Sequence, residues 1–127
     1  MHRLILAGLV LAFAGCAVFE GPSQRFVVFY GDLSAKLDDA AAAVVVGAAE
    51  FAKRHPEQPI LVSGFADPDG SPQANIDISR TRAQVVADAM VRVGVSPTRI
   101  QRRARGAVSF GSTSQESRRV EIAVGQP

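Results

Sequence analysis

The chain has 127 residues, a formal net charge of +2 and a single cysteine. This length suits one domain with one core, and one cysteine rules out a disulfide bond within the chain. The charge is unevenly divided, because residues 17–77 hold four basic and nine acidic side chains whereas residues 78–127 hold nine arginines and three acids. The arginine-rich stretch 99–105 lacks interleaved aromatic residues and any nucleic-acid-binding motif, so nucleic acid is not an expected partner. We interpret it as a solvated face that could rest on an anionic glycan or lipid.

The first sixteen residues have the pattern of a secretory leader. A short basic start is followed by an apolar run over residues 4–14, which is too short to span a bilayer. The segment LAFAGC, residues 11–16, resembles a bacterial lipobox, in which the cysteine is acylated and becomes the new N-terminus. We therefore expect residues 1–15 to be a signal peptide of the lipoprotein type and residues 16–24 to comprise lipidated Cys16 and a short linker. An ordinary signal peptide or a buried Cys16 is the alternative.

A strand and a helix are predicted at the start of the mature chain. Residues 25–30 are β-branched and aromatic, which is typical of a strand, and Gly31 ends it. Residues 37–53 have the spacing of an amphipathic helix, with Ser34 or Asp38 able to begin it. The expected core face of this helix comprises Ala41, Val44, Val45, Ala48 and Ala52.

A second strand, a loop and a second helix follow. Residues 60–65 are predicted to be a strand, and residues 66–72 a loop because they contain prolines and a glycine. The second helix is expected to run to about Val93, with Gly94 as its left-handed C-terminal cap. Its expected buried positions are Val85, Val86, Ala89, Met90 and Val93.

Two further strands, over residues 100–104 and 118–124, complete the pattern. The order strand, helix, strand, helix, strand, strand predicts an α/β sandwich. In this fold two main helices pack on one face of a four-stranded mixed sheet.

The loop and the second helix carry a pair of opposite charges. Asp67 follows the second strand, and Arg82 lies on the second helix. A ligand with an ammonium and a carboxylate on one carbon needs an anion for the first group and a planar pair of donors for the second, and arginine supplies two parallel hydrogen bonds. The pair therefore indicates a site for a zwitterion. The structural alternative is that Asp67 caps a turn or pairs with Arg82 in a salt bridge.

Residues 64–83, GFADPDGSPQANIDISRTRA, resemble the signature of the OmpA-like peptidoglycan-binding domain. The family pattern runs roughly G-H-T-D-x-x-G-x-x-x-x-N-x-x-L-S-x-x-R-A, and the matching positions are Gly64, Asp67, Gly70, Asn75, Ser79, Arg82 and Ala83. The resemblance extends from Arg25 to about Val124 and implies an OmpA-like domain over residues 25–127. It also implies that Asp67 and Arg82 bind the free end of meso-diaminopimelate in the peptide stem of peptidoglycan.

Three further positions are expected to support this site. Asn75 and Ser79 would orient the loop or cap the second helix, with a purely structural role as the alternative for both. Arg118 and Arg119 resemble the Asn-Arg-Arg-Val segment of the family, with Ser117 in place of Asn. Strand alternation puts Arg118 on the core face and Arg119 on the opposite face. An arginine at the rim of a core needs a carboxylate or carbonyl partner, so we expect Arg118 to be a structural anchor beside the pocket.

The sequence departs from the family pattern in two places. Phe65 and Ala66 replace the usual His-Thr, which is expected to remove an imidazole and a hydroxyl from the pocket edge. The loop over residues 106–117 is shorter than usual and lacks its proline, which is expected to reduce one wall of the pocket.

No motif indicates catalysis, a metal site or a cofactor. His55 is the single histidine after the leader. Asp67 and Asp69 lie two residues apart in a loop rich in proline and glycine, which fits turn chemistry better than a pair of acids flanking a glycosidic bond.

These observations predict a lipoprotein that binds peptidoglycan non-covalently and couples a membrane to the cell wall. Its acyl chains would anchor it in the membrane, and Ala17 after the cysteine favours sorting to the outer membrane with the domain facing the periplasm. Envelope proteins could be further partners. The alternative is a protein-interaction subunit of an envelope complex, in which the peptidoglycan pocket is vestigial.

Overall fold

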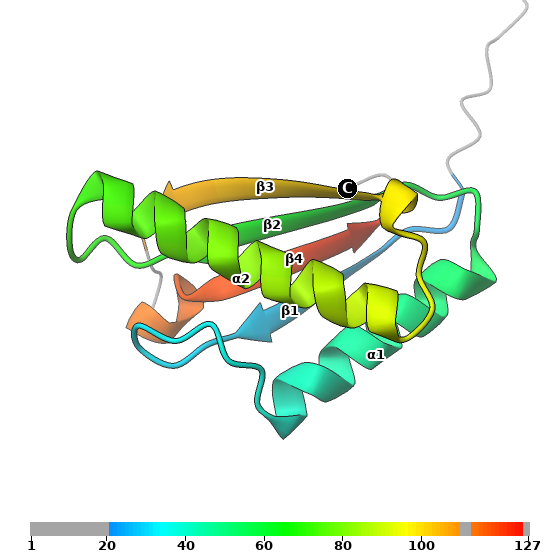
Figure 1. Cartoon of the computed structure of the whole chain (residues 1–127), viewed down its shortest axis with the longest axis horizontal. Coiled ribbons are helices and arrows are strands. Elements are labelled where there is room, and N and C mark those ends of the chain that lie inside the picture. The colour runs from blue at the N-terminus through cyan, green and yellow to red at the C-terminus, as the bar shows by residue number, and fades with distance from the viewer. Residues whose placement is uncertain (1–20, 110–112, 126–127) are drawn as a thin grey trace, which may run out of the picture.

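The computed structural model describes residues 21–109 and 113–125. This part of the chain has four strands and two main helices (Figure 1). Their bounds are β1 Gln24–Phe29, α1 Asp39–Arg54, β2 Ile60–Ala66, α2 Pro72–Arg92, β3 Ile100–Ala107 and β4 Arg119–Val124, with short 3-10 helices η1 at Pro97–Arg99 and η2 at Ser114–Glu116. The expected signal peptide and Cys16 lie outside the described residues.

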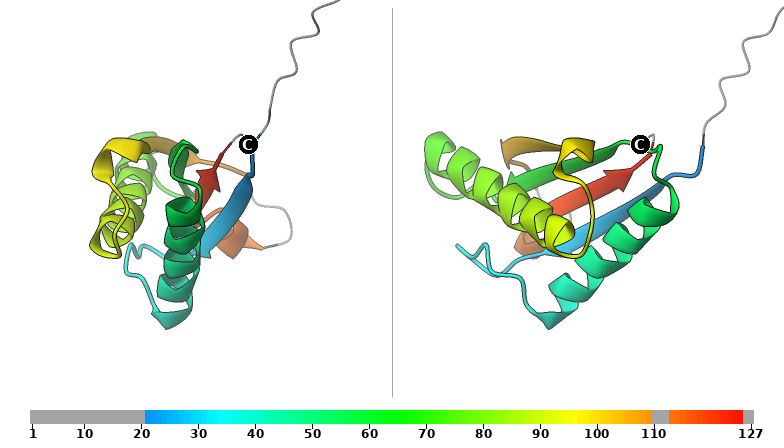
Figure 2. Two further views of the ribbon diagram at one scale, coloured as in Figure 1. Left: turned by 90° about the vertical axis from the view of Figure 1, so that its right-hand side faces the viewer. Right: turned by 45° about the vertical axis from the view of Figure 1, so that its right-hand side comes forward.

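The four strands form one mixed sheet in the order β1-β4-β2-β3. β4 is antiparallel to both β1 and β2, whereas β2 and β3 are parallel. Both main helices cover the same face of the sheet, and neither covers the other face, beside which the short η2 lies (Figure 2, left). The predicted fold class is thereby confirmed.

Asp38 sets the start of α1. Its carboxylate accepts a hydrogen bond from the Ala41 amide at 2.8 Å, so the helix begins at Asp39 and Ser34 is not its cap. The buried positions of α1 are Ala41, Val45, Ala48, Ala49 and Ala52, while Val44 packs at the margin of the core. The predicted core face is confirmed, with Ala49 added to it.

Ser71 sets the start of α2. Its hydroxyl accepts a hydrogen bond from the Ala74 amide at 3.1 Å, and Pro72 occupies the first helical position, where its missing N–H is harmless. Neither Asn75 nor Ser79 caps this helix. That part of the expectation for these two residues is wrong, because Ser71 already satisfies the helix start.

α2 ends in a Schellman motif built on Gly94. The Val95 amide donates to the Met90 carbonyl at 3.1 Å, and the Gly94 amide donates to the Val91 carbonyl at 3.0 Å. Gly94 has a φ of 106°, which confirms the predicted left-handed cap. The expected burial of Val93 is wrong. Val93 is 37% exposed and Val95 is 2% exposed, because the reversal at Gly94 turns Val95 back onto the core.

The hydrophobic core fills the space between the sheet and the two helices. α2 packs closely on β2 at Gly64, where any Cβ would collide with the Ser79 carbonyl. Gly64 is therefore required for this packing, and the packing fixes where the first turns of α2 lie relative to the end of β2.

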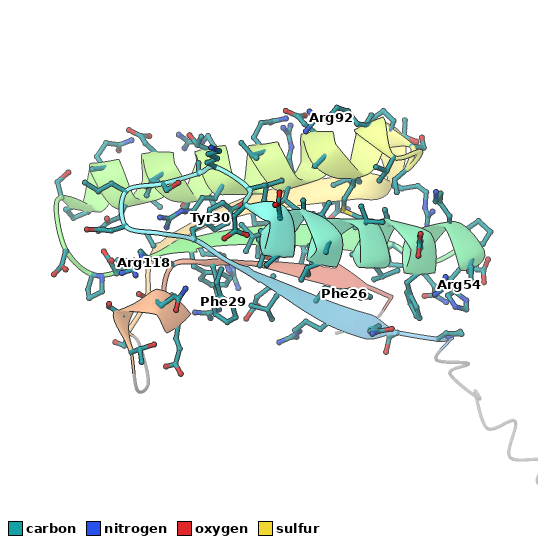
Figure 3. The ribbon with its side chains drawn as sticks, turned by 90° about the horizontal axis from the view of Figure 1, so that it is seen from below. Phe26, Phe29, Tyr30, Arg54, Arg92 and Arg118 are labelled. Carbon is teal, nitrogen blue, oxygen red and sulfur yellow. The ribbon has the colours of Figure 1, made fainter. Side chains whose placement is uncertain are left out.

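The two ends of the sheet differ in what they carry (Figure 3). At one end β1 begins and both helices finish; we call it the linker end, since the described chain enters there. At the other end β1 and β2 finish and both helices begin; we call it the site end. Arg54 and Arg92 lie at the linker end, whereas Tyr30 and Arg118 lie at the site end.

Candidate functional site

A cavity of about 230 Å³ opens at the site end, on the side of the sheet that carries the helices. Its walls are the loop after β1, the end of β2 with the loop that follows, the first half of α2, and the residue before β4. The lining residues are Asp32, Leu33, Ala66, Asp67, Asp69, Gly70, Asn75, Ile78, Arg82 and Arg118. Three carboxylates and two guanidinium groups surround one small volume, which suits a ligand that carries both signs of charge.

Arg82 joins α2 to two other walls of the cavity. Its side chain is buried, and Nε donates to the Ser34 carbonyl at 2.8 Å, Nη1 to the Phe65 carbonyl at 3.0 Å and Nη2 to the Gly31 carbonyl at 3.4 Å. Ser34 and Gly31 belong to the loop after β1, and Phe65 to the end of β2. A single side chain thus holds the loop, the strand and the helix in one arrangement.

Arg82 also retains donors for a ligand. A guanidinium group has five N–H bonds, and the three hydrogen bonds use one on each nitrogen, so one N–H remains on Nη1 and one on Nη2. Burial lowers the pKa of Arg82 below its usual value, while Tyr30 and the carboxylate of Asp67 act in the opposite direction. Arginine remains a cation at neutral pH even so. Its free donors and its charge are what a ligand carboxylate requires.

Tyr30 supports the Arg82 cation from the core side. The guanidinium carbon of Arg82 lies 5.2 Å from the centre of the Tyr30 ring, within the range of a cation–π contact. The Tyr30 hydroxyl is buried and has no hydrogen-bond partner within the described part of the chain. Burial raises the pKa of Tyr30 well above its usual value, against the opposing effect of the Arg82 charge. The phenol is therefore neutral throughout the physiological pH range.

Asp67 forms its salt bridge with Arg118 and not with Arg82. Arg118 Nη1 lies 3.3 Å from Asp67 Oδ2, and the two side chains are only 15% and 13% exposed. Arg118 Nε also donates to the Tyr30 carbonyl at 3.3 Å, so Arg118 has both kinds of partner expected for it. The second oxygen of Asp67, Oδ1, accepts no hydrogen bond from the described residues, which leaves it available to a ligand ammonium.

Asn75 and Ser79 have different surroundings. Asn75 lines the cavity, and its side-chain amide forms no hydrogen bond with the residues described. The Ser79 hydroxyl is fully buried, donates to the Ile76 carbonyl at 2.9 Å and accepts from the Gly106 amide at 3.1 Å. Ser79 therefore ties α2 to β3 away from the cavity, whereas Asn75 is free to contact a ligand.

The sequence reasoning missed the loop after β1, which contributes Asp32 and Leu33 to the cavity. Leu33 is 86% exposed and has a φ of 50°, a left-handed conformation that costs free energy for a residue with a side chain. The Arg82 hydrogen bonds to Gly31 and Ser34 hold this turn. The turn presents a carboxylate and an apolar side chain at the cavity rim, and the short Gly31-Asp32 segment was the only sequence signal for it.

The expectation that Phe65 alters the pocket edge is wrong. Phe65 points to the open face of the sheet, where the Arg119 guanidinium carbon lies 4.2 Å from the ring centre. Its carbonyl alone serves the site, as an acceptor for Arg82. Ala66 does line the cavity, so of the two replacements only the loss of a hydroxyl at Ala66 concerns the pocket.

Residues 21–109 and 113–125 contain no cluster of three or more side chains placed to hold a metal ion. None of their helices combines the length and the apolar character needed to cross a membrane.

The OmpA family profile matches residues 29–122, a range that includes every residue lining the cavity. The chain belongs to the OmpA family. This confirms the domain type predicted from the motif, an OmpA-like peptidoglycan-binding domain, and the family is non-enzymatic.

Two curated relatives have names that concern the bacterial envelope. "Probable lipoprotein YiaD" of Escherichia coli is 33% identical over 101 residues, which cover 75% of this chain and 46% of that protein. "Peptidoglycan-binding protein ArfA" of Mycobacterium bovis is 32% identical over 114 residues, which cover 85% of this chain and 33% of that protein. The chain thus spans less than half of the length of these relatives.

Solved structures share the fold. The peptidoglycan-associated lipoprotein from Burkholderia pseudomallei has a TM-score of 0.70 at 24% identity, covering 80% of this chain and 90% of that one. The periplasmic domain of Helicobacter pylori MotB, residues 97–256, has a TM-score of 0.66 at 17% identity, covering 80% of each chain. At these identities the likeness establishes the architecture alone.

Proposed function

We propose that this domain binds peptidoglycan non-covalently, through the free zwitterionic end of meso-diaminopimelate in the stem peptide. One observation carries the proposal: Arg82 is buried beside a cavity and keeps two unused N–H donors, while Asp67 keeps an unused oxygen at the same cavity. The ligand carboxylate would accept from Arg82, and its ammonium would donate to Asp67. Membership of the OmpA family and the name of the mycobacterial relative support the ligand class.

The other polar residues would position these two groups. Arg118 holds one oxygen of Asp67 and so fixes the direction of the other. Asn75 adds a free amide that can donate or accept. Two charge-assisted contacts at about 1.5–3 kcal/mol each correspond to dissociation constants from millimolar down to tens of micromolar. Such weak binding becomes useful when a membrane anchor confines the domain near the wall.

We further propose that Cys16 is lipidated, that residues 1–15 are removed, and that the protein couples the outer membrane to the wall from the periplasm. The name of the Escherichia coli relative supports the anchor. The arrangement of the domain is compatible with it, because the described chain enters at the linker end and the cavity opens at the site end. The seven residues between Cys16 and β1 reach about 25 Å when extended. Cys16→Ser should move the protein from the membrane fraction to the soluble periplasmic fraction; an unchanged membrane fraction would refute lipidation.

The competing function is a protein-interaction subunit with a vestigial pocket. The Asp67–Arg118 salt bridge and the three carbonyl partners of Arg82 favour it, since each charge already has a structural role. Sedimentation with purified sacculi separates the two functions. We expect the domain to sediment with sacculi and to be released by a soluble diaminopimelate stem peptide. A domain that stays in the supernatant at millimolar stem concentrations would leave the interaction subunit as the better account.

A further inference from the structure

The open face of the sheet carries an excess of positive charge. Strand alternation and register place four arginines on this face, away from the helices: Arg25 on β1, Arg119 on β4, and Arg103 and Arg105 on β3. A single acid of the four strands, Glu121 on β4, shares the face with them. Three of the nine arginines in residues 78–127 thus lie on this face, together with Arg25.

Much of this charge is not neutralised within the domain. Glu121 serves two arginines at once, with Arg119 Nε at 3.1 Å and Arg25 Nη1 at 4.0 Å. Arg103 and Arg105 are exposed and form no ion pair or hydrogen bond with any residue that the structure describes. A face that carried both acidic and basic side chains would be equally soluble, so solubility does not explain the excess of arginine. The excess of arginine therefore points to an anionic partner.

An exposed aromatic side chain lies on the same face. Phe29 is on β1, two residues along from Val27, and is 45% exposed. Arginines combined with an exposed aromatic side chain are typical of surfaces that lie at a membrane interface, where the ring enters the headgroup region and the cations meet phosphates. Four strands about 4.8 Å apart and about 20 Å long give a face of roughly 400 Å². That is about half of what each partner usually buries in a stable protein complex.

We propose that this open face, defined by Arg25, Phe29, Arg103, Arg105 and Arg119, docks on the headgroups of an anionic phospholipid bilayer. Docking lays the sheet on the membrane and turns the helices away from it. The cavity opens on the helix side, so it stays accessible to the wall in this orientation. The interaction needs neither the lipid anchor nor a stem peptide, so its test is independent of the proposed function.

The test uses the protein from Ala17 onward, without a lipid anchor. The core residues of the described chain all lie between Phe26 and Val124, so this protein keeps every one of them. Sedimentation is measured with phosphatidylcholine vesicles, alone or with about one third phosphatidylglycerol. We expect binding to the anionic vesicles alone, and we expect added salt to weaken it. No binding to anionic vesicles at low ionic strength would overturn the proposal.

Two double variants distinguish the open face from net charge. Arg103→Ser with Arg105→Ser removes two charges from the open face, whereas Arg54→Ser with Arg92→Ser removes two exposed charges from the helices. At roughly five-fold per arginine, the first pair should lower vesicle binding by roughly twenty-five-fold. The control pair should lower it by less than about five-fold. Equal losses would show that overall charge, and not this face, controls binding.

A fluorescence reporter gives the orientation directly. The chain contains no tryptophan, so Phe29→Trp introduces a single probe on the open face and Val46→Trp introduces one on α1. Both positions are already exposed, at 45% and 40%. On anionic vesicles the probe at residue 29 should shift to shorter wavelength and the probe at residue 46 should not. A shift at residue 46 without one at residue 29 would contradict the proposed orientation.

Discussion

Arg82 and Arg99 form the same kind of hydrogen-bonded contact with the backbone, at opposite ends of the domain. Each donates to three backbone carbonyls: Arg82 to those of Gly31, Ser34 and Phe65, and Arg99 to those of Ala52, His55 and Gln58. Arg99 secures the end of α1 and the turn after it at the linker end. Arg82 secures the loop after β1 and the end of β2 at the site end.

The surroundings of these two arginines separate a structural role from a functional one. The Arg99 guanidinium leaves Nε buried without a partner among the residues described. The Arg82 guanidinium faces a cavity that also holds Asp32, Asp67 and Asp69. Carbonyl contacts alone therefore do not identify a binding arginine. Arg99 keeps unpartnered N–H groups as well, so the cavity and the nearby carboxylates are what distinguish Arg82.

The largest effect on stability should come from removing the side chain of Arg82 or of Arg99. Arg82→Ala and Arg99→Ala each remove three hydrogen bonds to backbone carbonyls, and each should lower the free energy of unfolding by about 3–5 kcal/mol. Urea denaturation measures this loss. The binding comparison uses Arg99→Ala and Arg82→Lys under conditions where both stay folded. Arg99→Ala should bind sacculi like the wild type. Arg82→Lys should lose most binding, because a single ammonium cannot replace the two parallel N–H donors of a guanidinium group. Full sacculus binding by Arg82→Lys would contradict the claim that Arg82 binds the ligand whereas Arg99 has a structural role alone.

The next largest effect should come from removing the charge of Asp67, which lowers the affinity for the ligand. Asp67→Asn keeps the shape of the side chain but removes its charge, so it should weaken binding of a diaminopimelate stem peptide by about ten-fold or more. It should cost at most about 1–2 kcal/mol of stability, since it also weakens the partly buried pair with Arg118. Calorimetric titration and thermal unfolding measure the two quantities. Asp88→Asn, on the exposed side of α2, is the matched control and should change neither.

The raised pKa of Tyr30 predicts that the protein loses stability at alkaline pH. Its pKa is raised in the folded state, so its contribution to stability is complete below about pH 10 and is lost as the pH rises above that value. Tyr30→Phe should remove this slope, and it should be neutral or stabilising by about 1 kcal/mol because the lost hydroxyl has no partner. Tyr30 is the single tyrosine of the chain, so phenolate absorbance follows it directly. Ionisation at about pH 10 in the folded protein would contradict this.

The smallest effect should come from the turn at the cavity rim. Leu33→Gly relieves a left-handed conformation and should raise the free energy of unfolding by about 0.5–1 kcal/mol. Leu33→Ala keeps the unfavourable conformation and should change stability little, since the side chain is exposed. A stabilisation shared by both variants would point to exposure of the leucine, and not to its backbone, as the cause.

The local elements were predictable from the sequence because local chemistry determines them. Asp38 and Gly94 lie at helix boundaries as expected, and the spacing of small apolar residues identifies the core face of α1. Ser71, which caps α2, was missed because the cap was expected at Asn75 or Ser79. The strand order β1-β4-β2-β3 was not predictable, because pairing between distant strands leaves no periodic signal in any one of them.

The site was predictable in its members but not in its contacts. The motif identified Asp67 and Arg82, and both line the cavity. The pairing of Asp67 with Arg118, 51 residues away, depends on the register of β4 in the sheet. The carbonyl partners of Arg82 were not predictable either, since a backbone carbonyl has no residue type to mark it. The position of Phe65 on the open face follows from simple alternation after Gly64, a signal that was present but outweighed by the family pattern.

The most direct test of the account is a titration of the domain with two stem peptides that are identical except at the third residue, meso-diaminopimelate or L-lysine. Both carry the side-chain ammonium for Asp67, but only diaminopimelate carries the carboxylate for Arg82. We expect the diaminopimelate peptide to bind with a dissociation constant between about 1 mM and tens of micromolar, and at least about ten-fold tighter than the lysine peptide. Equal affinities for the two peptides would contradict the claim that Arg82 reads the ligand carboxylate.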